Sequence, residues 1–239
     1  MTEWFEEWFG ETYLALYPHR DDAEAERAVA LIMRTIPWQH GWRVLDVACG
    51  AGRHARALSD VGARCIGLDL SAVLLRRART RAPVPLIRAD MRALPVRPGS
   101  MDLTVNLFTS FGYFATDAEH AGALAGMAAT LRPAGWLVLD FLNADAVRTG
   151  LVPDEETHLA GQPVRIRREL TDDGRVVQKR ITTAEGRVFT ERVRLFSREE
   201  LAGMLEAAGL VVRHCFGDYD GGVITAASPR IVLMGERRQ

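Results

Sequence analysis

The sequence predicts an α/β fold built on a doubly wound, mostly parallel sheet of seven strands. From residue 44 onward, short apolar runs alternate with helical patterns, an order typical of parallel strands joined by right-handed crossovers. Acidic residues stand at the ends of several runs, where open α/β sheets bind their ligands. Over residues 164–196 apolar and charged residues alternate instead, which indicates an inserted, half-exposed antiparallel sheet.

The composition fits one large core and excludes several classes of protein. The chain has 239 residues, 48% of them hydrophobic, and no linker rich in Pro, Gly or Ser divides it, so we expect one domain with an insertion. A net charge of −1 argues against a general binder of polyanions. No apolar run reaches about 18 residues and the acidic, aromatic start is unlike a signal peptide, so a cytoplasmic protein is expected. The three cysteines form no C-x-x-C pair, so neither a disulfide framework nor a metal site is expected.

Two helices are expected before the first strand. Residues 3–17 and 21–36 have helical patterns, and Tyr17-Pro18-His19-Arg20 separates them. Acidic residues at the start of the second segment favour a helix N-terminus there. Because both helices precede the first strand, we expect residues 1–40 to cap a ligand cleft.

The stretch over residues 44–55 organises the rest of the chain. Its apolar run ends at the turn Ala48-Cys49-Gly50-Ala51-Gly52, and a helix is expected over residues 53–58. The two glycines allow unusual backbone angles and a close approach to a ligand, and the first amides of the helix point toward it. The turn therefore predicts a nucleotide-like ligand.

The remaining elements continue the alternation. Asp69, Asp90 and Asp140 follow the second, third and fifth expected strands, so a parallel sheet places them at one edge. Ser71 is expected to cap one helix, and a capping box at Ser197 to start another that stops at Gly209. After the first strand, strands are expected over residues 64–69, 84–88, 103–107, 135–139, 210–216 and 231–235, with a helix over 118–131.

The inserted sheet is expected to begin at residue 164 and to turn at Thr171-Asp172-Asp173-Gly174. Arg165, Arg167 and Arg168 fit an anionic substrate, but acids interleave with them. A solvated sheet face is our interpretation of these arginines.

The order of these parts resembles that of the class I S-adenosylmethionine-dependent methyltransferases, which have a Rossmann-like fold. The matching motifs are residues 44–52, Gly67-Leu68-Asp69-Leu70-Ser71, Ala89-Asp90-Met91 and 131–136, and the resemblance covers roughly residues 40–143 and 195–236. The insertion and residues 106–113 further resemble small-molecule enzymes of the glycine and amino-sugar N-methyltransferase kind. The resemblance implies a cofactor-binding domain over residues 41–150 and 195–239, and a substrate-side lid over 151–194.

A dinucleotide-binding protein is the rival interpretation. Gly50-x-Gly52-x-x-Ala55, with Asp69 downstream, also satisfies the dinucleotide fingerprint. Asp46 decides against it, because a pyrophosphate would meet this carboxylate as a like charge, whereas the ammonium and sulfonium of S-adenosylmethionine would be attracted. An NAD(P)-dependent oxidoreductase is therefore a remote alternative.

The resemblance also implies the residues that hold S-adenosylmethionine. The methionine moiety is assigned to Asp46 and the backbone of Ala48, Cys49, Gly50 and Gly52. Asp69, followed by Leu70, is assigned to the ribose, and Asp90, between Ala89 and Met91, to the adenine. Leu107 and Phe108 are expected near the sulfonium. In the cap, Tyr17 and Arg20 are candidates for the cofactor carboxylate, with a surface turn as the alternative.

Tyr113 is the first candidate to orient the acceptor or to pass on its proton. It lies in the loop after the fourth strand, where the amino-sugar enzymes place a histidine or tyrosine, and His19 on the cap is the second candidate. The alternative for Tyr113 is a packed aromatic beside Phe111 and Phe114.

Asn106-Leu107-Phe108-Thr109 departs from the Asn/Asp-Pro-Pro-aromatic turn of enzymes that methylate nucleobases or glutamine amides. A small-molecule acceptor, methylated at nitrogen or oxygen, is therefore expected. The alternatives are an RNA-modifying methyltransferase and a catalytically silent binding protein of the same fold. We expect a monomer or homodimer without nucleic-acid or membrane partners.

Overall fold

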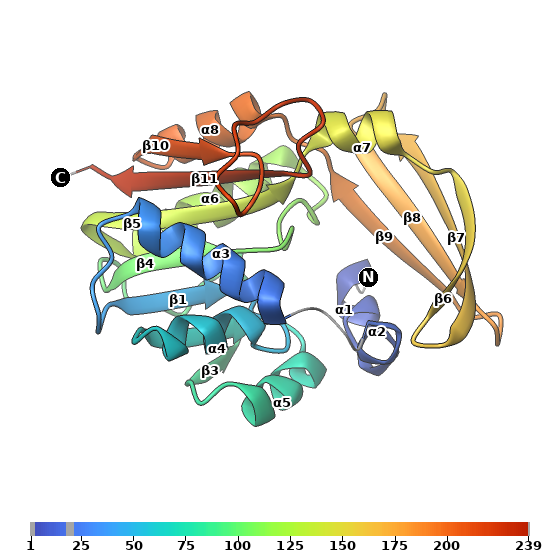
Figure 1. Ribbon diagram of the computed structural model, residues 1–239, viewed down its shortest axis with the longest axis horizontal. Coiled ribbons are helices and arrows are strands. Elements are labelled where there is room, and N and C mark those ends of the chain that lie inside the picture. Colours follow the sequence, from blue (N-terminus) through green and yellow to red (C-terminus); the bar gives the residue numbers. More distant parts are fainter. Residues whose placement is uncertain (1–2, 18–21, 239) are drawn as a thin grey trace.

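The computed structural model describes residues 3–17 and 22–238, in which seven strands form one twisted sheet (Figure 1). The strand order is β10-β11-β5-β4-β1-β2-β3; β11 pairs antiparallel with both β10 and β5, and the other neighbouring strands pair in parallel. This confirms the doubly wound, mostly parallel sheet. The strands are β1 Arg43–Val47, β2 Arg64–Asp69, β3 Leu86–Arg88, β4 Met101–Asn106, β5 Leu131–Leu142, β10 Leu210–Phe216 and β11 Arg230–Arg237.

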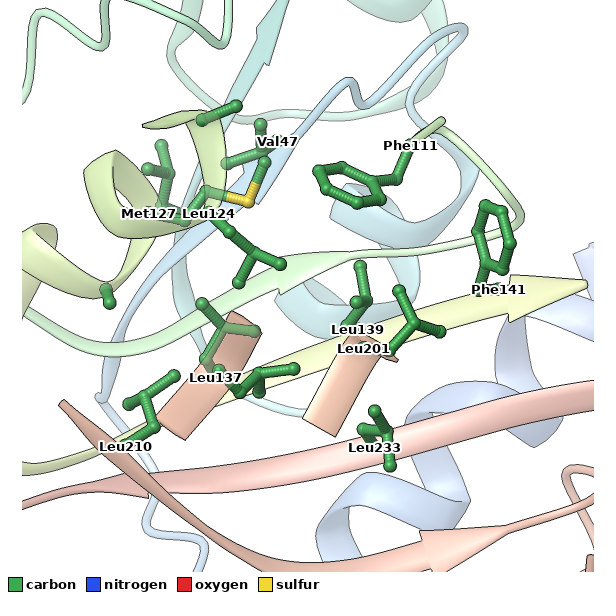
Figure 2. Close-up of a cluster of buried hydrophobic side chains, with 14 of the residues drawn as sticks. Val47, Phe111, Leu124, Met127, Leu137, Leu139, Phe141, Leu201, Leu210 and Leu233 are labelled. Atoms are coloured by element: carbon green, nitrogen blue, oxygen red, sulfur yellow. The ribbon is translucent and has the colours of Figure 1, made fainter. Parts of the chain in front are cut away.

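Helices cover both faces of this sheet because its central strands are apolar on both sides. On one face, α3 and α4 pack against side chains such as Val44, Leu103 and Val138. On the other, α6 and α8 pack against Leu137, Leu139 and other residues that Figure 2 shows as a close-packed cluster. The helices of the α/β layers are α3 Asp22–Thr35, α4 Arg53–Asp60, α5 Ala72–Arg81, α6 Asp117–Thr130 and α8 Arg198–Ala207.

Local capping signals explain several helix starts. The Ser71 hydroxyl accepts a hydrogen bond from the Leu74 amide at the start of α5. A capping box joins Ser197 and Glu200 at the start of α8, as predicted. These two helices begin where the sequence places them.

A second, antiparallel sheet of the order β6-β7-β8-β9 follows β5, which confirms the insertion. One face of it packs against α1 Trp4–Trp8 and α2 Glu11–Leu16, and Figure 1 shows these two helices between the sheets. The rings of Trp8 and Phe189 lie 4.9 Å apart at this contact. The strands are β6 Asp154–Leu159, β7 Gln162–Thr171, β8 Val176–Thr183 and β9 Val188–Arg194.

The arginines of β7 do not form a single solvated face. Arg165 and Arg167 are exposed and both pair with Asp154, as expected for a solvated face. Arg168 instead shares the face of the buried Ile166 and pairs with Glu155 at 2.8 Å. The interpretation is therefore wrong for Arg168.

The N-terminal prediction is also wrong in two respects. Residues 3–17 form two short helices because Gly10, the poorest helix former after proline, lies at the break and serves as the N-cap of α2. The helix expected over residues 21–36, which is α3, packs on the main sheet against α4 and does not cap the cleft.

Other differences concern the end of β5 and the segment after it. Strand β5 extends to Leu142 because β11 pairs with it beyond Leu139, where the pairing with β4 ends, so Asp140 lies inside the strand. Helix α7 Ala144–Gly150 and strand β6 were not predicted. Strand β6 is polar except for Leu159 at its end, so its sequence lacks the apolar alternation that marks a strand. None of the helices that the structure describes is long and apolar enough to cross a membrane.

Candidate active site

A cavity of about 910 Å³ lies beyond the carboxyl ends of β1, β2, β3 and β4. Helices α1 and α2 contribute one side, and the turn after β1 and the segments after β2, β3 and β4 contribute the other. Among the residues described, those of the smaller sheet do not line it, because α1 and α2 stand between. This is the position and size of a cofactor site in an open α/β sheet.

The turn after β1 is shaped by three left-handed residues. Ala48, Gly50 and Gly52 have φ angles of 58°, 55° and 83°. A Cβ on Gly52 would lie 3.1 Å from the Cβ of Ala78 on α5, so this glycine permits the close packing of α4 and α5. Ala48 adopts its angle despite a Cβ, at a cost of about 1–2 kcal/mol.

Asp69 fixes this turn from the end of β2. Its carboxylate accepts hydrogen bonds of 2.8 Å from the backbone amides of Gly50 and Ser71. Burial raises the pKa of Asp69, and the two amides oppose that rise. Each carboxylate oxygen has two acceptor positions, so Asp69 can hold the turn and still accept hydrogen bonds from a ligand in the cavity that it lines.

Asp46 lies behind the turn rather than on the cavity surface. It is 1% exposed, and its Oδ2 atom has no hydrogen-bond partner among the described residues. Burial, with a further contribution from the Asp69 charge, raises the pKa of Asp46 to about 8. A buried carboxylate is stabilised by a cation nearby. Asp46 itself does not line the cavity.

Asp90 is held by an arginine that the sequence did not single out. Its Oδ2 atom accepts hydrogen bonds from the Arg92 side chain at 2.7 and 3.0 Å, and its Oδ1 accepts the Arg92 amide. Burial acts to raise the pKa of Asp90, but Arg92 outweighs it and keeps this pKa below its usual value. Asp90 therefore lines the cavity as an ionised, oriented acceptor.

The loop after β4 forms another part of the cavity wall. Leu107 and Phe108 line the cavity, and the guanidinium of Arg53 lies 4.0 Å from the centre of the Phe108 ring. Arg53, in the first turn of α4, also pairs with Glu24 of α3 at 2.9 Å. Sequence reasoning missed Arg53, since neither partner is near it in the chain.

Tyr113 lies at the cavity end of an aromatic cluster. Its ring is 5.1 Å from that of Trp4 and 5.7 Å from that of Phe9, and its hydroxyl donates a 2.6 Å hydrogen bond to the carbonyl of Thr109. The packing and the cavity-lining position thus coexist in one residue.

The structure brings most of the expected cofactor residues together around the cavity. Gly52 lies outside the lining with Asp46, and Arg20 and His19 fall outside the described residues. Tyr17 lines the cavity, and its hydroxyl accepts a hydrogen bond from Lys179 of β8. The others in the lining are Ala48, Cys49, Gly50, Asp69, Leu70, Ala89, Asp90, Met91, Leu107 and Phe108.

Comparison with known proteins decides the family. A model described as a methyltransferase domain matches residues 44–135. The chain is 31% identical over 208 residues to the dTDP-3-amino-3,6-dideoxy-alpha-D-glucopyranose N,N-dimethyltransferase of Streptomyces fradiae, with 83% of this chain and 80% of that protein covered. The chain belongs to the S-adenosylmethionine-dependent methyltransferases.

Two solved structures agree with this assignment over nearly the whole methyltransferase. KedS8, a sugar N-methyltransferase from a Streptoalloteichus species, is 28% identical with a TM-score of 0.71 and covers 96% of this chain and 94% of its own. CalS10, an amino pentose methyltransferase from Micromonospora echinaspora solved with its bound cofactor, is 29% identical with a TM-score of 0.66 and covers 95% and 97%. The class I fold and the cofactor predicted from the sequence are confirmed, and the NAD(P)-dependent alternative is set aside.

The carboxylates in and behind the cavity fit S-adenosylmethionine. Acceptor carboxylates at Asp69 and Asp90 suit hydroxyl and amino groups, and the buried Asp46 with its unpartnered oxygen suits a cationic ligand. The cofactor supplies a methyl group bound to a sulfonium. The protein has to bind it, keep water away and hold an acceptor in line with the methyl group.

Proposed function

We propose that this methyltransferase acts on the amino nitrogen of a small molecule, an amino sugar carried on a nucleotide being the best-supported acceptor. The S. fradiae and CalS10 enzymes are named for amino-sugar acceptors and KedS8 for N-methylation of a sugar, and all three align over most of this chain. The observation that supports an amine acceptor is that two hydroxyl groups in the loop after β4 already donate their protons to backbone carbonyls. The Ser110 hydroxyl donates to the Leu107 carbonyl at 2.9 Å, and that of Tyr113 donates to Thr109.

Because both hydroxyl protons are engaged by backbone carbonyls, the two oxygens serve a ligand as hydrogen-bond acceptors. An acceptor oxygen is complementary to the N–H groups of an amine and orients the nitrogen lone pair away from itself. A neutral amine attacks with its lone pair and can release its proton to water after the transfer, whereas a sugar hydroxyl needs a base to remove its proton during the attack. Neither Ser110 nor Tyr113 is suited to act as that base in this arrangement. Positioning supplies most of the acceleration for an amine.

The smaller sheet supports the α1–α2 side of the cavity in this proposal. Lys179 contacts Tyr17, and Phe189 contacts Trp8, so β8 and β9 fix helices that lie next to the bound acceptor. Residues 151–194 therefore act as a substrate-side lid through α1 and α2, and residues 41–150 and 195–239 bind the cofactor.

Acceptor chemistry is tested with a matched pair of sugars. We expect methyl transfer to a dTDP-linked amino sugar, detected as one or two added methyl groups by mass spectrometry, and none to the dTDP sugar with a hydroxyl at the same carbon. Transfer RNA and a free peptide amine serve as controls for other acceptor classes. Preferred methylation of the hydroxyl sugar or of the RNA would contradict the proposal, as would cofactor binding without turnover on any amine.

Tyr113→Phe tests the role of the hydroxyl. The ring contacts with Trp4 and Phe9 are retained while the oxygen that faces the acceptor is lost. We expect turnover of the amino sugar to fall by about tenfold or more, because the hydroxyl oxygen orients the acceptor nitrogen and a misplacement of about 1 Å can cost about 10²-fold in rate. Cofactor affinity, measured by calorimetry, should stay unchanged. A smaller fall in turnover assigns Tyr113 to packing.

A further inference from the structure

A fully buried carboxylate stands next to the wall formed by Phe108. Asp140 on β5 is 0% exposed, and its side chain accepts hydrogen bonds from Arg230 at 2.6 and 2.8 Å and from the Tyr219 hydroxyl at 2.5 Å. A fourth donor is the backbone amide of Phe108, at 2.7 Å from Oδ2. The cluster joins β5, β11, the segment after β10 and the loop after β4.

The loop that Asp140 contacts has a backbone that needs external support. Phe108 and Thr109 have φ angles of 61° and 57°, in the left-handed region that bulky and β-branched residues avoid. Asp140 holds both amides, since its side chain accepts the Phe108 N–H and its main-chain carbonyl accepts the Thr109 N–H at 3.0 Å. Strained backbone persists where surrounding contacts over-determine it, and here one residue supplies two of those contacts.

The charges around the Phe108 ring are balanced in pairs. The guanidinium of Arg230 lies 5.0 Å from the ring centre, and that of Arg53 lies 4.0 Å from it. Glu24 neutralises Arg53, and Asp140 neutralises Arg230. Two guanidinium groups can therefore lie close to the same aromatic ring, because each forms an ion pair with a separate carboxylate.

The same loop carries Tyr113. The carbonyl that accepts the Tyr113 hydroxyl belongs to Thr109, whose amide is bound by Asp140. A short chain of hydrogen bonds therefore runs from Asp140 through Thr109 to Tyr113. A buried ion pair by itself adds little to the stability of a protein. The role of the Asp140–Arg230 pair is therefore sought in the loop that it orients.

We propose that Asp140 is a positioning residue of this methyltransferase, which together with Arg230 and Tyr219 fixes the Phe108–Thr109 backbone that forms the cofactor wall. It acts through the loop and does not itself line the cavity. The inference depends on the family's cofactor and not on the identity of the acceptor, so a binding measurement tests it independently of the proposed function.

Asp140→Asn is the decisive variant, with Asp102→Asn as its matched control. Asp102 lies on the same sheet, is 9% exposed, and likewise binds an arginine (Arg132, 2.5 Å) and a backbone amide (Arg43, 2.7 Å), but in a part of β4 remote from the cavity. Each protein is titrated calorimetrically with S-adenosylmethionine and with S-adenosylhomocysteine, whose sulfur is neutral.

We expect Asp140→Asn to weaken both ligands by about tenfold or more, because a neutral amide is a weaker acceptor for the Phe108 N–H and leaves the buried Arg230 without its carboxylate. The loss should be larger for S-adenosylmethionine, since Arg230 then lacks its counter-charge and repels a cationic ligand. Asp102→Asn should leave both affinities within about twofold of the unsubstituted protein. If Asp140→Asn binds both ligands as the control does, the proposal is overturned.

Tyr219→Phe keeps the inference testable if Asp140→Asn does not fold. It preserves the ion pair of Asp140 with Arg230 and removes only the hydroxyl that donates to the carboxylate. Hydrogen exchange, followed by mass spectrometry, should become faster in the peptide over residues 107–113 and stay unchanged in the one over 120–130. Unchanged exchange over 107–113 would show that the cluster does not hold the loop.

Discussion

Replacing Asp69 with alanine should weaken S-adenosylmethionine binding by about 1.5–3 kcal/mol, or about 10- to 150-fold, the range for hydrogen bonds to a charged group. The structure gives two reasons for this expectation. Asp69 presents a carboxylate to the cavity, and the same carboxylate binds the amides of Gly50 and Ser71, so its loss also releases the turn after β1 and the start of α5. Calorimetric titration with S-adenosylmethionine and S-adenosylhomocysteine measures the effect.

Asp60→Ala is a suitable control for this experiment. Asp60 ends α4, its side chain is 64% exposed, and its contact with Arg56 is a long surface pair of 3.9 Å. Surface pairs of this kind contribute little, so both affinities should remain as in the unsubstituted protein. If Asp69→Ala binds as tightly as Asp60→Ala, Asp69 has no part in holding the cofactor.

Asp46→Asn should stabilise the ligand-free protein, and increasingly so as the pH rises. The pKa of Asp46 is about 8 in the folded protein against an ordinary value of 3.8, so between these values the folded protein keeps a proton that the unfolded chain has lost. The contribution of Asp46 to the free energy of unfolding therefore falls as the pH rises through this window. Asparagine has the same shape and no charge, so the gain should reach on the order of 5 kcal/mol near pH 8.

Denaturant unfolding at several pH values between 4 and 9 measures this difference. Asp102→Asn provides a control with the opposite sign: burial acts to raise the pKa of Asp102, but Arg132 and the Arg43 amide outweigh it and keep this pKa below its usual value. Replacing Asp102 should thus destabilise the protein at neutral pH, where replacing Asp46 stabilises it. Parallel pH profiles for Asp46→Asn and the unsubstituted protein would refute the expected cost of the buried carboxyl.

The order of elements in the α/β domain could be predicted because each depends on local sequence. The turn after β1, the Ser71 cap and the capping box at Ser197 all act within a few residues of the chain, and all lie where expected. The break at Gly10 was missed because a single glycine is compatible with a helix pattern and is decided by packing. The position of α3 was also missed, because the sequence shows that the helix has an apolar face but not whether that face packs on the sheet or on the cleft.

The site was predictable to the extent that its residues belong to short motifs. Asp69, Asp90 and Phe108 lie at the end of a strand or just after one and line the cavity, and no long-range contact is needed to propose that. Arg53 pairs with Glu24, and Asp140 pairs with Arg230. The partners are far apart in the sequence, so no motif or spacing predicts these pairs. These distant contacts fix the geometry of the site. A sequence therefore identifies the residues that line the cavity but not the residues that hold them in place.

Strand β11 is the last strand of the described chain, yet it lies between β5 and β10. While the chain is being synthesised, β5 therefore presents an unpaired edge until residues 230–237 have left the ribosome. Such an edge is a template for wrong pairing between nascent chains, and its exposure lasts through the synthesis of the whole inserted sheet. Arg230, the first residue of β11, meets Asp140 only at that moment, so the nascent chain cannot acquire a finished cofactor wall before its sheet is closed.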